Sequence, residues 1–429
     1  MPPGPPQPDP PISRTGVIGV LAILIAAVSV CVSLLVPRLS EPGPMLGEEP
    51  SIRVRVARSA PTLTIEASRW VLASSSGDDL TALTAPVRVS VQDGGLLLAG
   101  PEGVGAAFPP GATVRVRCAW LEDLRIGDAM LPGSLSLSPV VREGGEGAIN
   151  AVARVPIETY IAGVIAAELY SHWPEETFKV QAVAARSFAM AQMERRRSRA
   201  FDVENTQLDQ VFRGRATLER SLAATEATRG VVLTHSGSVM HAYYSSTCGG
   251  RPAGAGETWP DHTNRSPPPL RARERAHFCD HSPVYRWEVE RETGIVREQL
   301  RHWARSRNDP LREVGRPISI EPSLVNTAGR PAQFTITDDR GGSFTITAEN
   351  LRIALNAQPP GLRVGSGSVR SGDLGVAIRG DRTVIAGRGF GHGVGMCQFC
   401  AEAMGLQGHA WRKMLGHFYP GARLERVYR

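Results

Sequence analysis

The sequence has little charge imbalance and few cysteines. Lys and Arg together number 48 against 42 Asp and Glu, a formal net charge of +6 spread over 429 residues. Nucleic-acid-binding proteins concentrate much more positive charge on one face, so the composition does not support a nucleic-acid partner. Six cysteines are too few for a disulfide scaffold in a chain of this length, but they suffice for one bridge or one metal site.

Low complexity and internal repeats are also absent. The chain contains 45 Gly and 33 Pro, together below the roughly one quarter that marks a low-complexity sequence. Apolar residues make up 42% and charged residues 21%, as in a globular protein with long loops. At roughly 150 residues per domain, the length predicts about two or three folding units.

One long apolar run stands near the N-terminus. Residues 16–36 carry no charge over 21 positions, close to the roughly 20 that an α-helix needs to cross the hydrocarbon layer. The run ends in Val36-Pro37-Arg38 without the small-residue exit site of a cleaved signal peptide. We therefore predict an uncleaved transmembrane helix at 16–36, preceded by a Pro-rich tail at 1–15 and followed by a linker at 37–50. Arg14 and Arg38 flank the run on opposite sides, so charge does not fix its orientation.

The remaining sequence predicts an α+β fold. Residues 51–150 contain alternating runs such as Val114-Arg115-Val116-Arg117, which predict a β-rich domain of half-buried strands. In the second region, 151–429, helical patterns cover 156–169, 174–197 and 217–228, another helix covers 296–306, and a final helix begins near Met396. Residues 231–234 and 239–246 flank Ser-Gly-Ser and predict a β-hairpin. Strands and helices are segregated along the chain, which is typical of an α+β fold.

Glu168 ends one predicted helix just before a break and a second helix. Nearby apolar residues, among them Val164, Leu169 and Trp173, predict partial desolvation of its carboxyl group, which raises a pKa toward general-acid use. On the second helix, Lys179 and Arg186 fall on one stripe by the three-and-four spacing. By this pattern alone, an ordinary surface acid is the favoured interpretation of Glu168.

Several ordered blocks resemble the SpoIID/LytB family, the stage II sporulation protein D and amidase-enhancer group. The blocks are ELYSHWPEETFKVQAVAARSFA at 168–189, DVENTQLDQVFRG at 202–214, AYYSSTCGG at 242–250, YRW at 285–287, GFGHGVGMCQ at 389–398 and FYPG at 418–421. The resemblance spans roughly residues 150 to 429, and it implies an ectodomain in which a helical catalytic core follows the β-rich part. An ordered set of this kind is far more specific than any one block.

The resemblance implies a peptidoglycan lytic transglycosylase that cuts peptide-free glycan strands, with Glu168 as its single catalytic acid. Ordinary glycosidases need two carboxyl groups. A lytic transglycosylase instead protonates the glycosidic oxygen and lets the muramic 6-hydroxyl attack C1, which leaves a 1,6-anhydro end, and the same carboxylate removes the hydroxyl proton.

We assign six further residues to substrate binding. Peptide-free strands expose a lactyl carboxylate on each muramic acid, which Arg186 or Lys179 is suited to bind, although Arg186 equally fits a structural ion pair. Strand alternation points one of Tyr243 and Tyr244 into the groove, and Tyr244 is preferred. His392 lies in a glycine loop that lacks the spacing of a dinucleotide fingerprint, so it is either a groove residue or a loop-stabilising one. Gln181 and Tyr285 complete the set through their places in the family blocks.

Two features depart from the family pattern. Leu169-Tyr170-Ser171-His172 replaces a common Met-Pro after the glutamate. Cys397 and Cys400 form a C-x-x-C motif, which is typical of a redox pair, a disulfide or half of a zinc site. The resemblance adds that some members bind zinc near the hairpin, where Cys248 and Cys279 are candidates for the other half, with His277 or His281 nearby.

Several alternatives remain open from the sequence. A structural zinc held by Cys248, Cys279, Cys397 and Cys400 and disulfide pairing outside the cytoplasm are both compatible with the spacing. Thioredoxin-like redox activity is disfavoured because no βαβ unit surrounds the motif. The reaction itself requires no cofactor. The enzyme hypothesis predicts a single-pass membrane protein with its domain on the extracytoplasmic side and glycan strands as partner; the alternative is a non-catalytic wall-binding protein that stimulates a cell-wall amidase.

Overall fold

A computed structural model describes residues 47–75, 79–101, 103–119, 123–142, 144–207, 209–260 and 266–429. The predicted tail, the predicted membrane helix and residues 37–46 of the predicted linker lie outside the described residues. Within the described ranges, no helix is both long and apolar enough to span a membrane. The membrane anchor at 16–36 therefore stays a prediction, while the mixed α+β class is confirmed.

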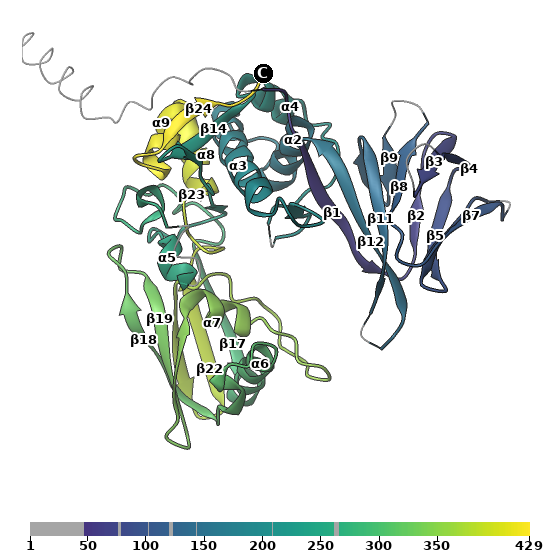
Figure 1. Cartoon of the computed structure of the whole chain (residues 1–429). Coiled ribbons are helices and arrows are strands. Elements are labelled where there is room, and N and C mark those ends of the chain that lie inside the picture. Colours follow the sequence, from purple (N-terminus) through teal and green to yellow (C-terminus); the bar gives the residue numbers. More distant parts are fainter. Residues whose placement is uncertain are drawn as a thin grey trace, which may run out of the picture. The chain divides into compact units, whose positions relative to one another are not determined.

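The first part of the described chain is β-rich, as its alternating sequence predicts (Figure 1). One sheet has the order β13-β1-β12-β11-β8-β3-β4, and a second has the order β2-β5-β6-β7. In β8 (Val114–Cys118) buried and exposed residues alternate strictly, because successive side chains of a strand point to opposite faces. The other strands here are β1 (Ser51–Ala60), β2 (Leu63–Ile65), β3 (Trp70–Ser74), β4 (Thr81–Thr84), β5 (Val87–Gln92), β6 (Gly95–Ala99), β7 (Gly105–Phe108), β9 (Leu124–Ile126), β10 (Ala129–Leu131), β11 (Ser134–Val141), β12 (Gly147–Pro156) and β13 (Val203–Glu204).

Strand β12 leads from the β-rich part directly into the helices. It pairs antiparallel with β1 along its length and continues past residue 150, where the sequence predicts a domain boundary, to Pro156. Helix α2 (Ile157–Glu168) begins at the next residue. The β-rich sheet and the first helix are therefore joined without a linker, and β13, which follows the helices in sequence, returns to pair parallel with β1.

Three helices match the predicted segments at 156–169, 174–197 and 217–228. They are α2, α3 (Glu175–Arg195) and α4 (Glu219–Ala227). Helix α3 is buried along most of its length, and its alanines Ala182, Ala184, Ala185 and Ala189 have no exposed surface. Small side chains let neighbouring helices approach closely, and α3 contacts α2, α4, α8 (Gln398–Leu406) and α9 (Trp411–Phe418).

The predicted hairpin is shorter than its sequence pattern suggests. Strands β14 (Val231–His235) and β15 (Ser238–Val239) form it, and β24 (Arg423–Arg426) pairs with the other edge of β14. Residues Tyr244–Ser245, predicted as the end of the hairpin, instead form β16, which pairs parallel with β23 (Met396–Cys397). This pairing brings the AYYSSTCGG block beside the GFGHGVGMCQ block.

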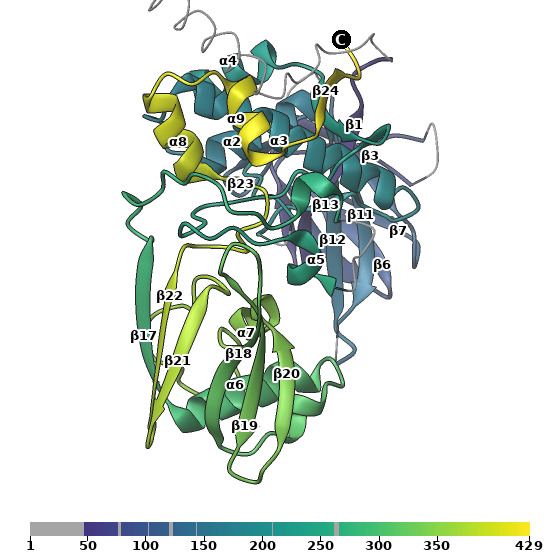
Figure 2. The same cartoon turned by 90° about the vertical axis from the view of Figure 1, so that its left-hand side faces the viewer.

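The region between these two blocks forms its own core (Figure 2). It has two three-stranded sheets, ordered β17-β22-β21 and β18-β19-β20. Helices α6 (Thr293–Arg305), which confirms the helix predicted at 296–306, and α7 (Ala348–Ala354) supply much of the apolar core with the strands. The strands are β17 (Arg286–Glu292), β18 (Pro317–Val325), β19 (Pro331–Asp338), β20 (Ser343–Thr347), β21 (Leu374–Arg379) and β22 (Arg382–Arg388).

Candidate active site

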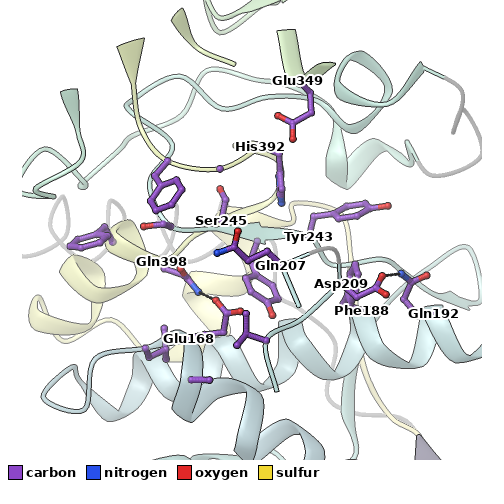
Figure 3. A pocket seen from close by; sticks show the side chains of 18 of the residues that line it. Glu168, Phe188, Gln192, Gln207, Asp209, Tyr243, Ser245, Glu349, His392 and Gln398 are labelled. Carbon is purple, nitrogen blue, oxygen red and sulfur yellow. Dashed lines mark hydrogen bonds between the residues drawn. The ribbon is translucent and has the colours of Figure 1, made fainter. Parts of the chain in front are cut away.

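A cavity of about 840 Å³ opens where the family blocks meet (Figure 3). Its walls come from the end of α2, one side of α3, the segment 207–213, β16 with the residues around it, α7, and the glycine loop that leads into α8. Segments far apart in the sequence therefore meet at one site. Of the predicted site residues, Glu168, Tyr244 and His392 line this cavity.

Glu168 is the last residue of α2 and lies half-buried in the cavity wall. Burial raises the pKa of its carboxyl group, against hydrogen bonds from the Gln398 side chain and the Val211 backbone that lower it. Desolvation disfavours the charged form of an acid, so the group holds its proton to a higher pH than an exposed glutamate does. The environment predicted from the sequence is thus the one observed around this carboxyl.

Gln398 holds the Glu168 carboxyl in place. Its Nε2 donates to Glu168 Oε2 at 3.2 Å (Figure 3). The same nitrogen is 3.4 Å from Gln181 Oε1. Gln398 is the first residue of α8, where the Cys397 side chain caps the helix by accepting from the Cys400 N–H. The orientation of the acid therefore depends on how the start of α8 is held.

Two tyrosines and a glutamine form a buried chain of hydrogen bonds behind the cavity wall. Tyr160 donates to Gln210 Oε1 at 3.1 Å, and Gln210 Nε2 donates to the Tyr244 hydroxyl at 3.0 Å. Burial raises the pKa of Tyr244 well above its usual range, and the negative charge of Glu168 adds to the shift. Tyr244 therefore remains a neutral phenol. Both Tyr243 and Tyr244 line the cavity, so the predicted division between one core ring and one groove ring is only partly correct.

Two further carboxyl groups line the cavity, and both have fixed partners. Asp209 accepts from Arg196 and from Gln192, each at 2.6 Å. For Glu349, burial works to raise the pKa, but the hydrogen bonds and charge of Arg352 outweigh it and the pKa is lowered. In Figure 3 the Asp209 carboxyl faces Gln192, and Glu349 lies on the far side of His392 from Glu168. Burial thus raises the pKa of Glu168, whereas the pKa of Glu349 is lowered.

His392 both lines the cavity and stabilises its loop. Its Nδ1 accepts from the Val394 N–H at 3.0 Å, and its ring lies 5.1 Å from the ring of Trp259. Burial lowers the pKa of His392 to about 4, so the imidazole is neutral near pH 7. The two roles left open by the sequence are therefore combined in one residue.

Aromatic rings give the cavity an apolar wall. Tyr243 lies 4.6 Å from Trp259, and Phe399 packs edge-on against Trp173 at 5.1 Å. Tyr170, from the segment that replaces the family's Met-Pro, is 5.3 Å from Trp173 and lines the cavity as well. Rings with one free face are typical of pockets for ligands that have both apolar surface and hydroxyl groups, as sugars do.

Arg186 does not reach the cavity. It is fully buried, and its guanidinium donates to both carboxylate oxygens of Glu158, at 3.0 and 2.7 Å, and to the Val231 carbonyl at 3.0 Å. The Tyr428 hydroxyl completes the cluster by donating to Glu158 Oε1 at 2.7 Å. This placement corrects the prediction that Arg186 binds substrate. Its partners make it the structural ion-pair member that the sequence left open.

The remaining predicted substrate-binding residues also lie outside the cavity lining. Lys179 forms ion pairs with Glu175 and Glu176 on its own helix, at 2.7 and 2.9 Å. Gln181 is fully buried behind Gln398 and supports the acid indirectly. Tyr285 is half-buried, with its hydroxyl 3.4 Å from His277 Nε2. The face of α3 that carries Lys179 and Arg186 therefore does not line the cavity.

The four cysteines predicted as a metal site converge. The Sγ atoms of Cys248, Cys279, Cys397 and Cys400 all lie within 4.8 Å of one another, and all four residues are buried. The Cys248 sulfur is 3.6 Å from that of Cys279 and 3.9 Å from that of Cys400. Tetrahedral zinc with bonds of about 2.3 Å to sulfur requires neighbouring sulfurs about 3.8 Å apart, whereas a disulfide bond is about 2.05 Å.

Backbone groups support the same cluster. The N–H groups of Cys248 and Cys400 point at the Cys397 sulfur at 3.3 and 3.4 Å, and the Phe278 N–H points at the Cys400 sulfur at 3.4 Å. Such outer contacts orient the ligands and partly offset thiolate charge. The residues therefore fit zinc. The candidate histidines make other contacts, since His281 bonds Glu402 at 2.7 Å and His277 lies against Tyr285.

Sequence reasoning missed several residues that line the cavity. Three of them, Gln398, Asp209 and Arg213, lie inside the family blocks, so their positions carried a signal. Their side chains alone gave no chemical reason to select them. Trp259 stands outside every block, and only the fold brings it to His392. Its role in the cavity has no signal in the sequence.

Comparison with known proteins supports the family resemblance. Residues 145–235 match a family described as Stage II sporulation protein, and residues 272–395 match a Domain of unknown function (DUF8618). Stage II sporulation protein D of Bacillus subtilis (strain 168) is 24% identical over 307 residues, which cover 68% of this chain and 80% of that protein. The Amidase enhancer of the same organism is 25% identical over 293 residues, covering 62% of this chain and 40% of the enhancer. An uncharacterized protein of Brachyspira hyodysenteriae is 26% identical over 273 residues, 63% of this chain and 67% of that one.

The fold and the site define a mixed α+β protein with a cavity built around one desolvated acid. The comparisons support the SpoIID/LytB family that the ordered sequence blocks predict, because the chain is similar both to its family model and to relatives named Stage II sporulation protein D and Amidase enhancer.

Proposed function

We propose that this protein is a peptidoglycan lytic transglycosylase that cleaves peptide-free glycan strands with Glu168 as its catalytic acid. The observation that carries the proposal is the raised pKa of the Glu168 carboxyl in a cavity of about 840 Å³ walled by aromatic rings. A carboxyl group that keeps its proton to a higher pH than an exposed glutamate is suited to general-acid cleavage of a glycosidic bond.

The chemistry requires only this one acid. Glu168 protonates the glycosidic oxygen that leaves with one sugar, and C1 of the muramic acid becomes oxocarbenium-like. The 6-hydroxyl of the same muramic acid attacks C1, and its proton returns to the Glu168 carboxylate, so that a 1,6-anhydro end forms and the acid is regenerated. A glycosidase that uses water needs a second carboxylate as base or nucleophile, whereas Asp209 and Glu349 are engaged by arginines.

The other cavity residues have supporting parts in this mechanism. The Gln398 amide orients the acid, and the neutral His392 lines the same cavity without adding a charge. The rings of Trp259 and Tyr243 offer surfaces on which the apolar faces of sugar rings pack. Positioning of this kind contributes because a substrate held in the reactive geometry loses little further entropy at the transition state.

The proposal includes a location and a structural metal. Glycan strands of the wall lie outside the cytoplasm, so the predicted helix at 16–36 would anchor the chain with its large domain on the extracytoplasmic side. Zinc held by Cys248, Cys279, Cys397 and Cys400 would tie β16 and the start of α8 together. Its part is structural: it would hold the helix that carries Gln398.

The test is product analysis. Purified glycan strands freed of peptides are incubated with the full chain, and the fragments are separated and weighed by mass spectrometry. The proposal predicts fragments that end in 1,6-anhydromuramic acid. Fragments with ordinary reducing ends would show a hydrolase instead, and intact strands would exclude cleavage.

A second candidate function rests on the similarity to the Amidase enhancer. In this alternative the cavity binds glycan strands without cleaving them, and the protein stimulates a cell-wall amidase. Strand binding by wild type without cleavage, together with faster peptide release when a purified amidase is added, would support the enhancer function.

A further inference from the structure

The segment that follows Asp209 is fixed against the rest of the fold at two points. Phe212 is buried with its ring 5.0 Å from that of Tyr160 on α2. Gly214, at φ +95°, pairs with Met130 in an isolated bridge, and a Cβ on Gly214 would meet the Met130 carbonyl oxygen at 2.5 Å. The backbone on both sides of Arg213 is therefore held in a defined position.

Side chains along this segment alternate between the interior and the cavity. Phe212 and Gly214 are buried, while Arg213 between them is exposed. Val211 and Arg213 both line the cavity, and the Val211 backbone hydrogen-bonds the Glu168 carboxyl. Arg213 is thus two residues along the chain from Val211, which contacts the catalytic acid directly.

Arg213 differs from the other three arginines that line the cavity. Arg196 pairs with Asp209, Arg352 pairs with Glu349, and Arg195 donates to Gln192 at 2.7 Å. Among the described residues, no hydrogen bond or ion pair involves the Arg213 side chain. Its guanidinium is therefore the cavity-lining cation whose donors remain open to a ligand within the described part of the chain.

We propose that Arg213 binds the lactyl carboxylate of muramic acid and thereby selects peptide-free strands. This inference rests on the proposed function, since it takes the glycan strand as the ligand. A guanidinium presents two parallel N–H donors that match a carboxylate. When a peptide is attached, the same lactyl group is an uncharged amide that offers one carbonyl oxygen, so the charged pair is lost.

The assignment replaces the two cations chosen from the sequence. Arg186 is buried with Glu158, and Lys179 is paired on its own helix. Arg213 differs from both of them, because it lines the cavity and lies two residues from Val211, whose backbone contacts the acid. Discrimination by this residue requires no steric exclusion of the peptide, only the loss of one charge-assisted contact.

The test separates binding from cleavage. Full chains carrying Glu168→Gln, with and without Arg213→Gln, are titrated with peptide-free strands and with the same strands after methyl esterification of the lactyl carboxylates. The control is Arg117→Gln, which removes an exposed arginine of β8 that does not line the cavity. Thermal unfolding of each variant checks the fold.

The expected result is that Arg213→Gln weakens binding of the free strands about tenfold or more and leaves binding of the esterified strands unchanged. Arg117→Gln changes neither, and Arg213→Lys keeps a preference for the free strands. Equal weakening of both strand types by Arg213→Gln, no weakening of either, or no binding of free strands by the parent chain would overturn the assignment. Because the titration needs no turnover, a wild-type chain that fails to cleave strands would refute the proposed function without deciding this test.

Discussion

The Gln398 amide donates a hydrogen bond to the Glu168 carboxyl at 3.2 Å across 230 residues of sequence. This contact joins the end of α2 to the start of α8, and it lowers the pKa that burial raises. The pKa of Glu168 therefore depends on two opposing influences. Burial raises it, and the hydrogen bonds that the carboxyl group accepts lower it.

Replacing Gln398 by Met is expected to move the pH profile. Loss of the hydrogen bond raises the pKa of Glu168 further, so the acid stays protonated to a higher pH and the alkaline limb of kcat shifts upward. Loss of orientation lowers kcat about tenfold to a hundredfold at the optimum. Steady-state rates on peptide-free strands measured across pH test both effects.

The matched control is Gln407→Met at the exposed end of the same helix. It is expected to leave the profile in place. An alkaline limb that does not move in Gln398→Met would contradict the role given to this amide.

The cysteine cluster predicts a bound metal. The purified chain is expected to contain about one zinc, and Cys400→Ser is expected to lose most of it and to unfold at a lower temperature, because the metal ties separate segments together. Cys118→Ser is the control, since that thiol is buried in β8 outside the cluster. Metal analysis with thermal unfolding makes the comparison, and a metal-free wild type that is insensitive to chelators would argue for thiols alone.

Arg186 is expected to act on stability rather than on substrate affinity. Removing one partner of the buried pair with Glu158 leaves an uncompensated charge, so Arg186→Met should lower the free energy of unfolding by about 3–5 kcal/mol. Glu158→Gln in the same chain should restore part of the loss. Urea unfolding measures both variants. An Arg186→Met variant with unchanged stability and a raised KM would contradict this and would support a role for Arg186 in substrate binding.

Gly163 lies inside α2, where alanine is ordinarily favoured by about 1 kcal/mol. Here a Cβ would lie 2.4 Å from the Gly214 carbonyl oxygen and 2.7 Å from the Phe212 ring. We therefore expect Gly163→Ala to destabilise the protein by about 1–3 kcal/mol and to reduce activity, because it displaces the segment beside Glu168. Gly294→Ala in α6 has nothing within 4 Å and should be neutral or slightly stabilising. Chemical unfolding measures the free energy of unfolding of both variants. Equal values would contradict the prediction, because they would show that the segment at 212–214 moves aside at no cost.

Local patterns predicted most of the helices and the β-rich part correctly. Helices α2, α3, α4 and α6 match because their ends and apolar spacing are encoded within each segment. The predicted hairpin end at Tyr244–Ser245 was wrong because that pair finds its partner in β23, about 150 residues later. Strand pairing over such a distance leaves no periodic signal.

The site residues divide in the same way, into those that local sequence marks and those that only the fold reveals. Glu168 and the four cysteines were predicted because a family block or a residue type marks them. Arg186 was assigned to substrate because its helical stripe says which face it occupies but not that Glu158 and Tyr428 cover that face. Arg213 was overlooked because its distinction is the absence of a partner among the described residues, which only the fold reveals.

Digestion of peptide-free glycan strands by wild type and by Glu168→Gln, side by side, tests the central claim most directly. The amide fits the same space and keeps strand binding, but it has no proton to give to the glycosidic oxygen. The account predicts 1,6-anhydro ends from wild type and none from the variant, with both proteins binding the strands. Undiminished cleavage by Glu168→Gln would contradict it.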